Sequence, residues 1–331
     1  MHSISKERLI ELKNNFGGKK IAVVGDLMLD GYFWGNVSRI SPEAPVPVVE
    51  VDDEFFRFGG AANVALNILK LGGIPFPIGI TGNDSNGAIF SALLKENNIT
   101  DKGIIKDPSR PTTTKTRVIA NSQHVVRIDK ENKLPVSPEI EDKIINLFKS
   151  RAEDLDAVIL EDYNKGVLTE RVIKEIISIA KEKKIAVTVD PKFHNFFSYT
   201  GVTVFKPNRK ETEDALGMKL RTDADIEKAG NILLDKLKAE YALVTLGEGG
   251  MALFQQGKPH SKVATKARKV ADVSGAGDTV ISTLTMALVS GAAIEEASYL
   301  ANYAGGIVCE EVGIIPIEIE KLFRNVMEDE D

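Results

Sequence analysis

Residues 156–192 read DAVILEDYNKGVLTERVIKEIISIAKEKKIAVTVDPK, and this stretch indicates the fold. Its two ends, 156–163 and 185–192, are short, rich in β-branched residues and apolar without alternation, as buried parallel strands are. The segment between them, 169–184, has the apolar spacing of a helix, with Thr169 placed to cap its start. A strand, a helix and a second strand in this order predict a parallel βαβ unit.

The same alternation extends over most of the chain. Further apolar runs at 20–26, 202–208 and 241–248 are predicted to be strands of the same sheet. Residues 223–240 have a helical pattern, and we expect Asp223 to cap that helix. The sequence therefore predicts an α/β fold in which helices cover both faces of a mainly parallel sheet.

Each predicted strand has a polar residue near its carboxyl end. These residues are Asp26, Asp162, Asp190, Asn208 and Glu248. In open α/β sheets, ligands bind outside the carboxyl ends of the strands. Loop residues are often polar for structural reasons alone, but a polar residue at every one of these ends favours a shared cleft.

Two regions depart from the βα pattern. Residues 45–51 and 114–128 alternate between apolar and polar side chains, as half-exposed strands do, with a turn at 121–122. Neither region is paired with a crossover helix, so we predict a small β lid over the cleft, formed by segments 31–58 and 112–128. The whole chain of 331 residues is expected to be one domain with this lid.

Composition excludes several classes of protein. The net charge of −6 gives no basic surface for nucleic acid or an anionic membrane. Cys309 is the single cysteine and the four histidines are scattered, so neither a disulfide framework nor a cysteine zinc site is expected. The sequence has no apolar run of membrane-spanning length and no signal-peptide core at its start, which predicts a cytoplasmic protein.

A glycine-rich loop, VADVSGAGDT at 270–279, precedes an apolar helical run. Glycines let a ligand approach the backbone closely, and the first turn of a helix offers free N–H groups and a partial positive charge. Together they predict an anion site suited to a phosphoryl group. Asp278 beside this site could accept a proton from an attacking hydroxyl, or it could simply cap the helix. No P-loop motif is present, and Val280 stands where a dinucleotide-binding fingerprint needs a third small residue.

A second glycine cluster is FGGAANVALNILKLGG at 58–73. Gly59 and Gly60 precede a predicted helix that carries Asn63 near its start. An amide side chain both donates and accepts hydrogen bonds, which suits sugar hydroxyls. A tight turn before a well-packed helix explains the pattern equally well.

A third motif is KPNRKE at 206–211. Asn208 and Glu211 are three residues apart, and at a helix start they lie on one face. Their oxygens could order water around Mg²⁺, which prefers oxygen ligands and keeps several waters. The alternative is a capping pair with no metal.

In this order, the three motifs resemble the sugar-binding motif, the N-x-x-E motif and the C-terminal signature of the ribokinase-like (phosphofructokinase-B type) carbohydrate kinases. The resemblance covers roughly residues 18–315. It implies a ribokinase-like three-layer α/β/α fold with a β lid, an ATP-dependent sugar kinase activity, and Mg²⁺ as a cofactor. It also implies a site for a monovalent cation, K⁺. In this family lids often pair across a dimer, so we expect a homodimer.

A closer resemblance lies in residues 23–51, 160–168 and 189–192. These segments are similar to the family members that phosphorylate D-glycero-D-manno-heptose 7-phosphate at its anomeric oxygen. The run SRISPEAPVPVV at 38–49 is the most specific, because sugar kinases in general lack it. Many such kinases are fused to a nucleotidyltransferase; no H-x-G-H-type segment follows here, so the resemblance implies a stand-alone kinase.

The resemblance assigns catalytic and cofactor roles by motif. Asp278 is the implied base, and the implied anion hole consists of the backbone amides of Gly275, Ala276 and Gly277. The residues implied to serve Mg²⁺ through water are Asn208 and Glu211. Asp272 is implied to lie near a monovalent cation or a structural site. The residues implied to lie near the nucleotide are Thr245, Gly247, Gly250 and Asn302.

Substrate-binding roles follow in the same way. The residues implied to hold the sugar are Asp26, Asp30, Gly59, Gly60, Asn63 and Asp190. The 7-phosphate needs a cation, and charge pairing favours Lys165, Lys192 and Arg127, in falling order. Each of these could instead be an ordinary surface cation.

Two positions depart from the family pattern. Ser274 stands where threonine is commoner, and both residues offer a hydroxyl. Asn164 stands where glycine is expected before Lys165, and asparagine tolerates the left-handed region better than most residues. Neither change affects the expected base.

The implied reaction is the ATP-dependent phosphorylation of heptose 7-phosphate to the 1,7-bisphosphate, on the route to the ADP-heptose of lipopolysaccharide cores. One alternative is a kinase of another sugar phosphate, such as fructose 6-phosphate. A kinase of unphosphorylated sugars or nucleosides is less favoured, because three cations lie in or near the predicted cleft. A further alternative, from another class, is a catalytically silent protein that binds a sugar or nucleotide. Retention of Asp278 among its glycines argues against this last alternative.

Overall fold

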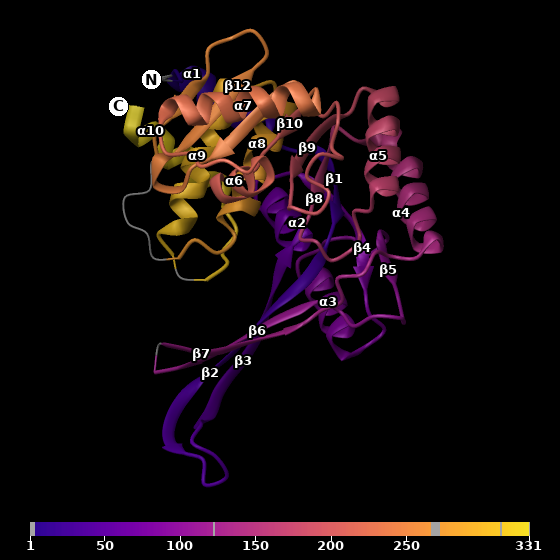
Figure 1. Ribbon diagram of the computed structural model, residues 1–331, viewed down its shortest axis with the longest axis vertical. Coiled ribbons are helices and arrows are strands. Elements are labelled where there is room, and N and C mark those ends of the chain that lie inside the picture. Colours follow the sequence, from indigo (N-terminus) through magenta and orange to yellow (C-terminus); the bar gives the residue numbers. More distant parts are fainter. Residues whose placement is uncertain (1–3, 122, 266–271, 312, 331) are drawn as a thin grey trace.

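The computed structural model describes residues 4–121, 123–265, 272–311 and 313–330. Its centre is a nine-stranded sheet with strands β1 (Lys20–Gly25), β4 (Ile74–Thr81), β5 (Ile104–Lys106), β8 (Ala157–Glu161), β9 (Ala186–Asp190), β10 (Val204–Phe205), β11 (Tyr241–Thr245), β12 (Met251–Gln255) and β13 (Ser261–Val263). Their spatial order is β13-β12-β11-β10-β9-β8-β1-β4-β5 (Figure 1). All pairs from β11 to β5 are parallel, and the β11–β12–β13 edge is antiparallel.

The five strands predicted from apolar runs are all present, and they are the five central strands of the sheet. β1 shows why such runs do not alternate. Ile21 and Val23 face one hydrophobic core, whereas Ala22 and Val24 face the other. Both faces of the strand are therefore buried, as in a parallel sheet covered on both sides.

Helices form a layer on each face. One layer contains α1 (Lys6–Asn15), α2 (Ala61–Lys70), α3 (Ser85–Glu96), α8 (Ala276–Val289), α9 (Ile294–Cys309) and α10 (Ile319–Glu330). The other contains α4 (Pro138–Arg151), α5 (Glu170–Lys183), α6 (Arg209–Leu216) and α7 (Asp223–Leu237). Short 3₁₀ turns lie at Ala152–Asp154 and Gly247–Gly249. The predicted three-layer α/β/α architecture is thereby confirmed. Among the described residues, no helix has both the length and the apolar character needed to cross a membrane.

The predicted helix starts were right in one case and wrong in the other. The Thr169 hydroxyl accepts a hydrogen bond from the amide of Val172 and caps α5, as expected. The cap of α7 is Thr222, and Asp223 is already the first helical residue. Thr222 and Asp225 form a reciprocal capping box, which satisfies two backbone donors where Asp223 would satisfy one.

The lid is a separate four-stranded sheet that projects from the body (Figure 1). Its strands are β2 (Leu27–Ile40), β3 (Pro47–Gly60), β6 (Thr114–Ala120) and β7 (Gln123–Lys130), in the order β3-β2-β6-β7. Two antiparallel hairpins meet through a parallel β2–β6 pair, so segments far apart in sequence lie side by side. These strands extend slightly beyond the segments expected from sequence. Asn121 of the predicted turn has φ 51°, and Ser122 lies outside the described residues.

Candidate active site

Asp278 lies in the first turn of α8, beside the carboxyl ends of β8 and β9. It is 3% exposed, and its carboxylate accepts hydrogen bonds from Nδ2 of Asn63 at 2.7 Å and from the hydroxyl of Tyr163 at 2.8 Å. Burial raises the pKa of Asp278 to about 6; Asp190 contributes to the rise, while the two hydrogen bonds and Lys192 oppose it. A carboxylate with this pKa is mostly ionised at pH 7 and still basic enough to accept a proton.

The turn before α8 depends on glycine. Gly275 is the N-cap with φ 78°, and a Cβ there would lie 3.2 Å from Nδ2 of Asn63. Gly277 lines the adjoining cleft. The amide of Ala276 donates to the carbonyl of Val273 at 3.3 Å, a long hydrogen bond. The remaining first-turn amides lack partners within a helix, so they can face an anion.

Three carboxylates converge beneath this turn. Oxygens of Glu161, Asp190 and Asp278 all lie within 4.8 Å of one another. Lys206 Nζ is 2.8 Å from Asp190, and Lys192 Nζ is 3.6 Å from it. Burial alone would raise the pKa of Asp190, but the two ammonium groups hold it below its usual range. The oxygens could bind a divalent cation, yet the two lysines already balance part of their charge.

Glu161 is the least satisfied member of this cluster. It is fully buried, and neither carboxylate oxygen has a hydrogen-bond partner among the described residues. Burial raises the pKa of Glu161 well above its usual range, and the nearby carboxylates of Asp190 and Asp278 raise it further. Two like charges this close favour a proton on one of them.

The glycines of the second motif allow close backbone packing at the base of the lid. A Cβ on Gly59 would lie 2.2 Å from Oδ2 of Asp30, and one on Gly60 would lie 2.4 Å from the carbonyl oxygen of Asp26. Asp30 forms a buried ion pair with Arg117 from β6. The packing explanation of these glycines is therefore sufficient, and of the polar residues beside them Asn63 bonds Asp278.

Asp26 organises the loop that follows β8. Its carboxylate accepts hydrogen bonds from the amides of Tyr163 at 2.8 Å, Lys165 at 3.0 Å and Val167 at 3.2 Å. Burial raises its pKa to about 6, with a contribution from Asp162. The structure gives this carboxylate a positioning contact to the loop, in addition to the sugar contact that the sequence implies.

The three cations expected to bind a distal phosphate all have carboxylate partners. Lys192 Nζ lies 2.6 Å from Oε1 of Glu211, and Lys165 Nζ lies 2.7 Å from Oε2 of Glu131. The Arg127 side chain is 57% exposed on β7, the outer strand of the lid, and pairs with an adjacent aspartate. The structure therefore places Lys192 in the cleft beside Asp278 and Lys165 in a neighbouring pocket that shares Tyr163 with it, and leaves Arg127 on the exposed face of the lid.

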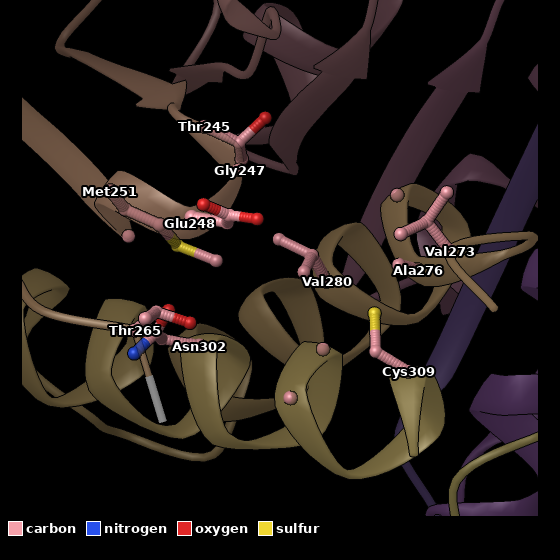
Figure 2. A pocket seen from close by; sticks show the side chains of 14 residues that line it. Thr245, Gly247, Glu248, Met251, Thr265, Val273, Ala276, Val280, Asn302 and Cys309 are labelled. Carbon is pink, nitrogen blue, oxygen red and sulfur yellow. The ribbon is translucent and has the colours of Figure 1, made fainter. Parts of the chain in front are cut away.

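A second cavity, of about 330 Å³, adjoins the helix turn and falls at the lower end of the usual size range for small-molecule sites (Figure 2). It lies between the β11–β12 connection and helices α8 and α9. Its lining residues are Thr245, Gly247, Glu248, Gly250, Met251, Thr265, Val273, Ala276, Gly277, Val280, Asn302, Gly305, Gly306 and Cys309. Asn302 donates to the carbonyl of Ala264 at 2.6 Å. All four residues that the sequence assigns to the nucleotide therefore line one cavity next to Asp278.

Asn208 and Glu211 form a capping box at the start of α6. Oδ1 of Asn208 accepts from the Glu211 amide, and Oε2 of Glu211 accepts from the Asn208 amide, both at 2.8 Å. The other oxygen of Glu211 binds Lys192. Both side chains are thus already engaged, which fits a contact to Mg²⁺ through water better than direct coordination.

Asp272 holds together the loops before α8 and after α9. Its carboxylate accepts from the amides of Ser274 at 2.9 Å and Gly313 at 3.1 Å. Burial would raise the pKa of Asp272, but these hydrogen bonds and Arg117 lower it overall. The first two residues of its motif, 270–271, lie outside the described residues.

Several residues at the site were not assigned from sequence. Tyr163 and Glu161 lie within the quoted LEDYNKGVL segment, and Lys206 opens KPNRKE. Arg117 lies on a predicted lid strand. Spacing gave no reason to single them out, because each acts on a residue distant in sequence: Tyr163 on Asp278, Lys206 on Asp190 and Arg117 on Asp30.

Comparison with known proteins bears on the family and the fold of this chain. Residues 18–321 match the pfkB family carbohydrate kinase description. A bifunctional protein HldE from Geobacter sulfurreducens is 42% identical over 306 residues, which is 92% of this chain and 62% of that protein. HldE from Helicobacter pylori strain HPAG1 is 40% identical over 304 residues, 92% of this chain and 65% of that protein. The chain thus spans less than two thirds of the length of these relatives.

Solved structures share the fold at low sequence identity. A ribokinase from Arabidopsis thaliana, complexed with ribose and ATP, superposes with a TM-score of 0.72 at 20% identity over 93% of this chain and 99% of its own. Phosphofructokinase-2 from Escherichia coli, in complex with fructose-6-phosphate, superposes with a TM-score of 0.74 at 18% identity. The match covers 94% of this chain and 99% of that one. With the family match covering most of the chain, this protein belongs to the pfkB family of carbohydrate kinases.

Proposed function

We propose that this kinase transfers the γ-phosphoryl group of ATP to the anomeric hydroxyl of D-glycero-D-manno-heptose 7-phosphate. The observation that carries phosphoryl transfer is the buried Asp278, held by two side chains beside a helix N-terminus and next to the candidate nucleotide cavity. The identity of the sugar is supported by the resemblance of residues 38–49 and by the HldE relatives. The product is the 1,7-bisphosphate.

In the proposed mechanism, Asp278 accepts the proton of the sugar O1 hydroxyl. The O1 oxygen attacks the γ-phosphorus in line, the bond to the β–γ bridging oxygen breaks, and ADP leaves. Amides of the first turn of α8 stabilise negative charge on the transferring group, and Lys192 and Lys206 lie along the same cleft. The lid excludes water, which limits wasteful hydrolysis of ATP.

We propose that Mg²⁺ binds through water to Asn208 and Glu211, with the Asp190 carboxylate on the same cleft. Carboxylate and amide oxygens are the donors that Mg²⁺ prefers, and the metal would offset phosphate charge when bound. We place the monovalent cation, K⁺, near Asp272, whose carboxylate joins two loops.

We also propose a homodimer formed through the lid, with the reaction in the cytoplasm. β7 is an edge strand whose residues are all exposed, and Val126 and Ile128 on it are 50% and 53% exposed. Ile40 and Val51 on the other hairpin are 61% and 51% exposed. Exposed apolar edge strands tend to pair with another chain.

The test is release of ADP from ATP and Mg²⁺ with heptose 7-phosphate, fructose 6-phosphate, ribose or adenosine as acceptor. Asp278→Asn should lower kcat by about 10²- to 10⁴-fold and leave ATP binding intact, whereas the exposed control Asp154→Asn should match the wild type. Preference for fructose 6-phosphate would retain the mechanism and contradict the heptose assignment. Binding of ATP without turnover of any acceptor would indicate the silent binding protein.

A further inference from the structure

Lys115 is a half-buried cation of the lid that the family motifs leave unassigned. It lies on β6, in register with Asp30 of β2. Asp30 already forms its ion pair with Arg117. Within the described ranges, no carboxylate lies within 4.0 Å of the Lys115 ammonium group.

Two lysines flank the same aromatic ring. The Nζ atoms of Lys115 and Lys192 each lie 5.1 Å from the centroid of the Tyr163 ring, and the hydroxyl of that ring binds Asp278. Lys192 pairs with Glu211 and lines the cleft that holds Asn208 and Gly277, so it faces the nucleotide side. Lys115 reaches the ring from the lid, on the side of Asp30. The two cations therefore reach the tyrosine that holds Asp278 from different elements, Lys115 from the lid strand β6 and Lys192 from the loop after β9.

The charged groups around Lys115 leave the charge of its ammonium group only partly balanced. Burial lowers the pKa of Lys115 and Asp30 raises it; Lys165 lowers it further, whereas Glu131 and Asp129 raise it. Two lysines thus approach each other, and the nearest carboxylates are bound to other cations. A cation removed from water without a partner costs free energy that a bound anion recovers.

We propose that Lys115 binds the phosphate group of a sugar phosphate at the end remote from the reacting hydroxyl, with Lys165 as its second cation. This inference rests on the proposed function and adds the residue that selects phosphorylated sugars. The geometry fits, because Lys115 and Asp278 both contact Tyr163. The Nζ atom of Lys115 lies 5.1 Å from the centroid of the ring, and the hydroxyl of the ring bonds Asp278 at 2.8 Å. A lysine suits this task, since its ammonium group is a compact charge on a flexible stem.

The test compares Lys115→Met with the control Lys130→Met, an exposed lysine on the neighbouring strand of the same lid. Kinetics are measured with heptose 7-phosphate, fructose 6-phosphate and unphosphorylated D-glycero-D-manno-heptose. Lys115→Met should raise KM for the preferred sugar phosphate roughly 10- to 100-fold, the usual effect of losing a charge-assisted hydrogen bond. KM for ATP, and kcat/KM for the unphosphorylated heptose, should stay at the wild-type values. Lys115→Arg should restore most of the affinity.

The possible results distinguish failure of the Lys115 assignment from failure of the proposed function. If the wild type phosphorylates a sugar phosphate and Lys115→Met does so with an unchanged KM, the Lys115 assignment is wrong and the function stands. Equal losses on phosphorylated and unphosphorylated heptose would also overturn it, because they indicate a structural role. Turnover of unphosphorylated sugars alone by the wild type would overturn both. If Lys115→Met shows no stabilisation by ATP in a thermal shift assay, Lys115→Gln replaces it in the same comparison.

Discussion

The hydroxyl of Tyr163 donates a 2.8 Å hydrogen bond to Oδ1 of Asp278, and this bond joins the loop after β8 to the first turn of α8. Burial raises the pKa of Tyr163 well above its usual range, so the phenol stays protonated and acts only as a donor. Nδ2 of Asn63 fixes the other oxygen of the carboxylate. Asp278 is thus held in one orientation by groups from two other parts of the chain.

Tyr163→Phe tests what this bond does to the base. The hydrogen bond lowers the pKa of Asp278, so its loss raises that pKa and leaves less of the carboxylate ionised at pH 7. We expect wild-type kcat to fall below pH 6 and the acid limb of the variant to lie about one pH unit higher. Activity of the variant should recover above pH 8. Tyr241→Phe, at a tyrosine remote from Asp278, is the control, and coincident pH profiles for Tyr163→Phe and wild type would contradict the assignment.

Glu161→Gln tests how much the unpartnered carboxylate of Glu161 lowers the free energy of unfolding. The pKa of Glu161 is raised in the folded state, so above its ordinary value of 4.5 the unfolded chain binds fewer protons than the folded one. The free energy of unfolding contributed by Glu161 is therefore complete below pH 4.5 and is lost as pH rises toward its folded pKa. A folded-state pKa one pH unit above the unfolded-state pKa corresponds to about 1.4 kcal/mol.

The measurement is urea denaturation of both proteins from pH 4 to pH 8. Glu161→Gln should gain stability relative to wild type as pH rises, because glutamine carries no charge. The raised pKa of Asp26 acts in both proteins, so the difference between the two curves reports Glu161 together with its interactions with Asp190 and Asp278. Curves that stay parallel over this range would show that Glu161 is satisfied in solution.

Gly59→Ala tests the close approach at the base of the lid. The added methyl group would lie 2.2 Å from Oδ2 of Asp30, so the carboxylate that pairs with Arg117 has to shift. We expect a loss of about 1–3 kcal/mol of stability together with weaker sugar binding, while ATP binding persists. Gly17→Ala is the matched control, because a Cβ there meets nothing within 4 Å. Wild-type sugar affinity in Gly59→Ala would show that Asp30 does not bind the sugar.

Thr222→Ala and Asp223→Ala distinguish the observed cap of α7 from the expected one. Thr222→Ala removes a side-chain acceptor from the amide of Asp225 and should cost about 1 kcal/mol. Asp223→Ala removes an exposed ion pair with Lys262 and should cost less than about 0.5 kcal/mol. Chemical denaturation measures both, and the reverse ranking would restore Asp223 as the cap.

The sheet was predictable from sequence because a strand that is buried on both faces consists of consecutive apolar residues. β1 and β8 contain only apolar residues between their ends, and that composition alone separates them from half-exposed strands. The exposed lid strands were also visible, through alternation. The start of α7 was missed by one residue, since Thr222, Asp223 and Asp225 are all good capping residues and only geometry selects among them.

The site was predictable where a motif concentrates its chemistry in a few consecutive residues. Asp278 and its glycines are such a case. Tyr163, Lys115 and Glu161 were not found, because their roles come from contacts between strands distant in sequence. A tyrosine in a loop and a lysine on an alternating strand look ordinary until the β2–β6 pair places the lid over the loop.

The connections between the lid and the body are very short. β2 begins one residue after Asp26, and β3 passes directly into α2, where Asn63 lies in the first turn. The amide of Ala61 donates to the carbonyl of Asp26 at 3.1 Å, which ties the two attachment points to each other. A tilt of the lid therefore rotates the start of α2 and shifts the amide that Asn63 offers to Asp278. The lid and the residue that orients Asp278 thus belong to one continuous stretch of backbone, because no loop residue separates β3 from α2.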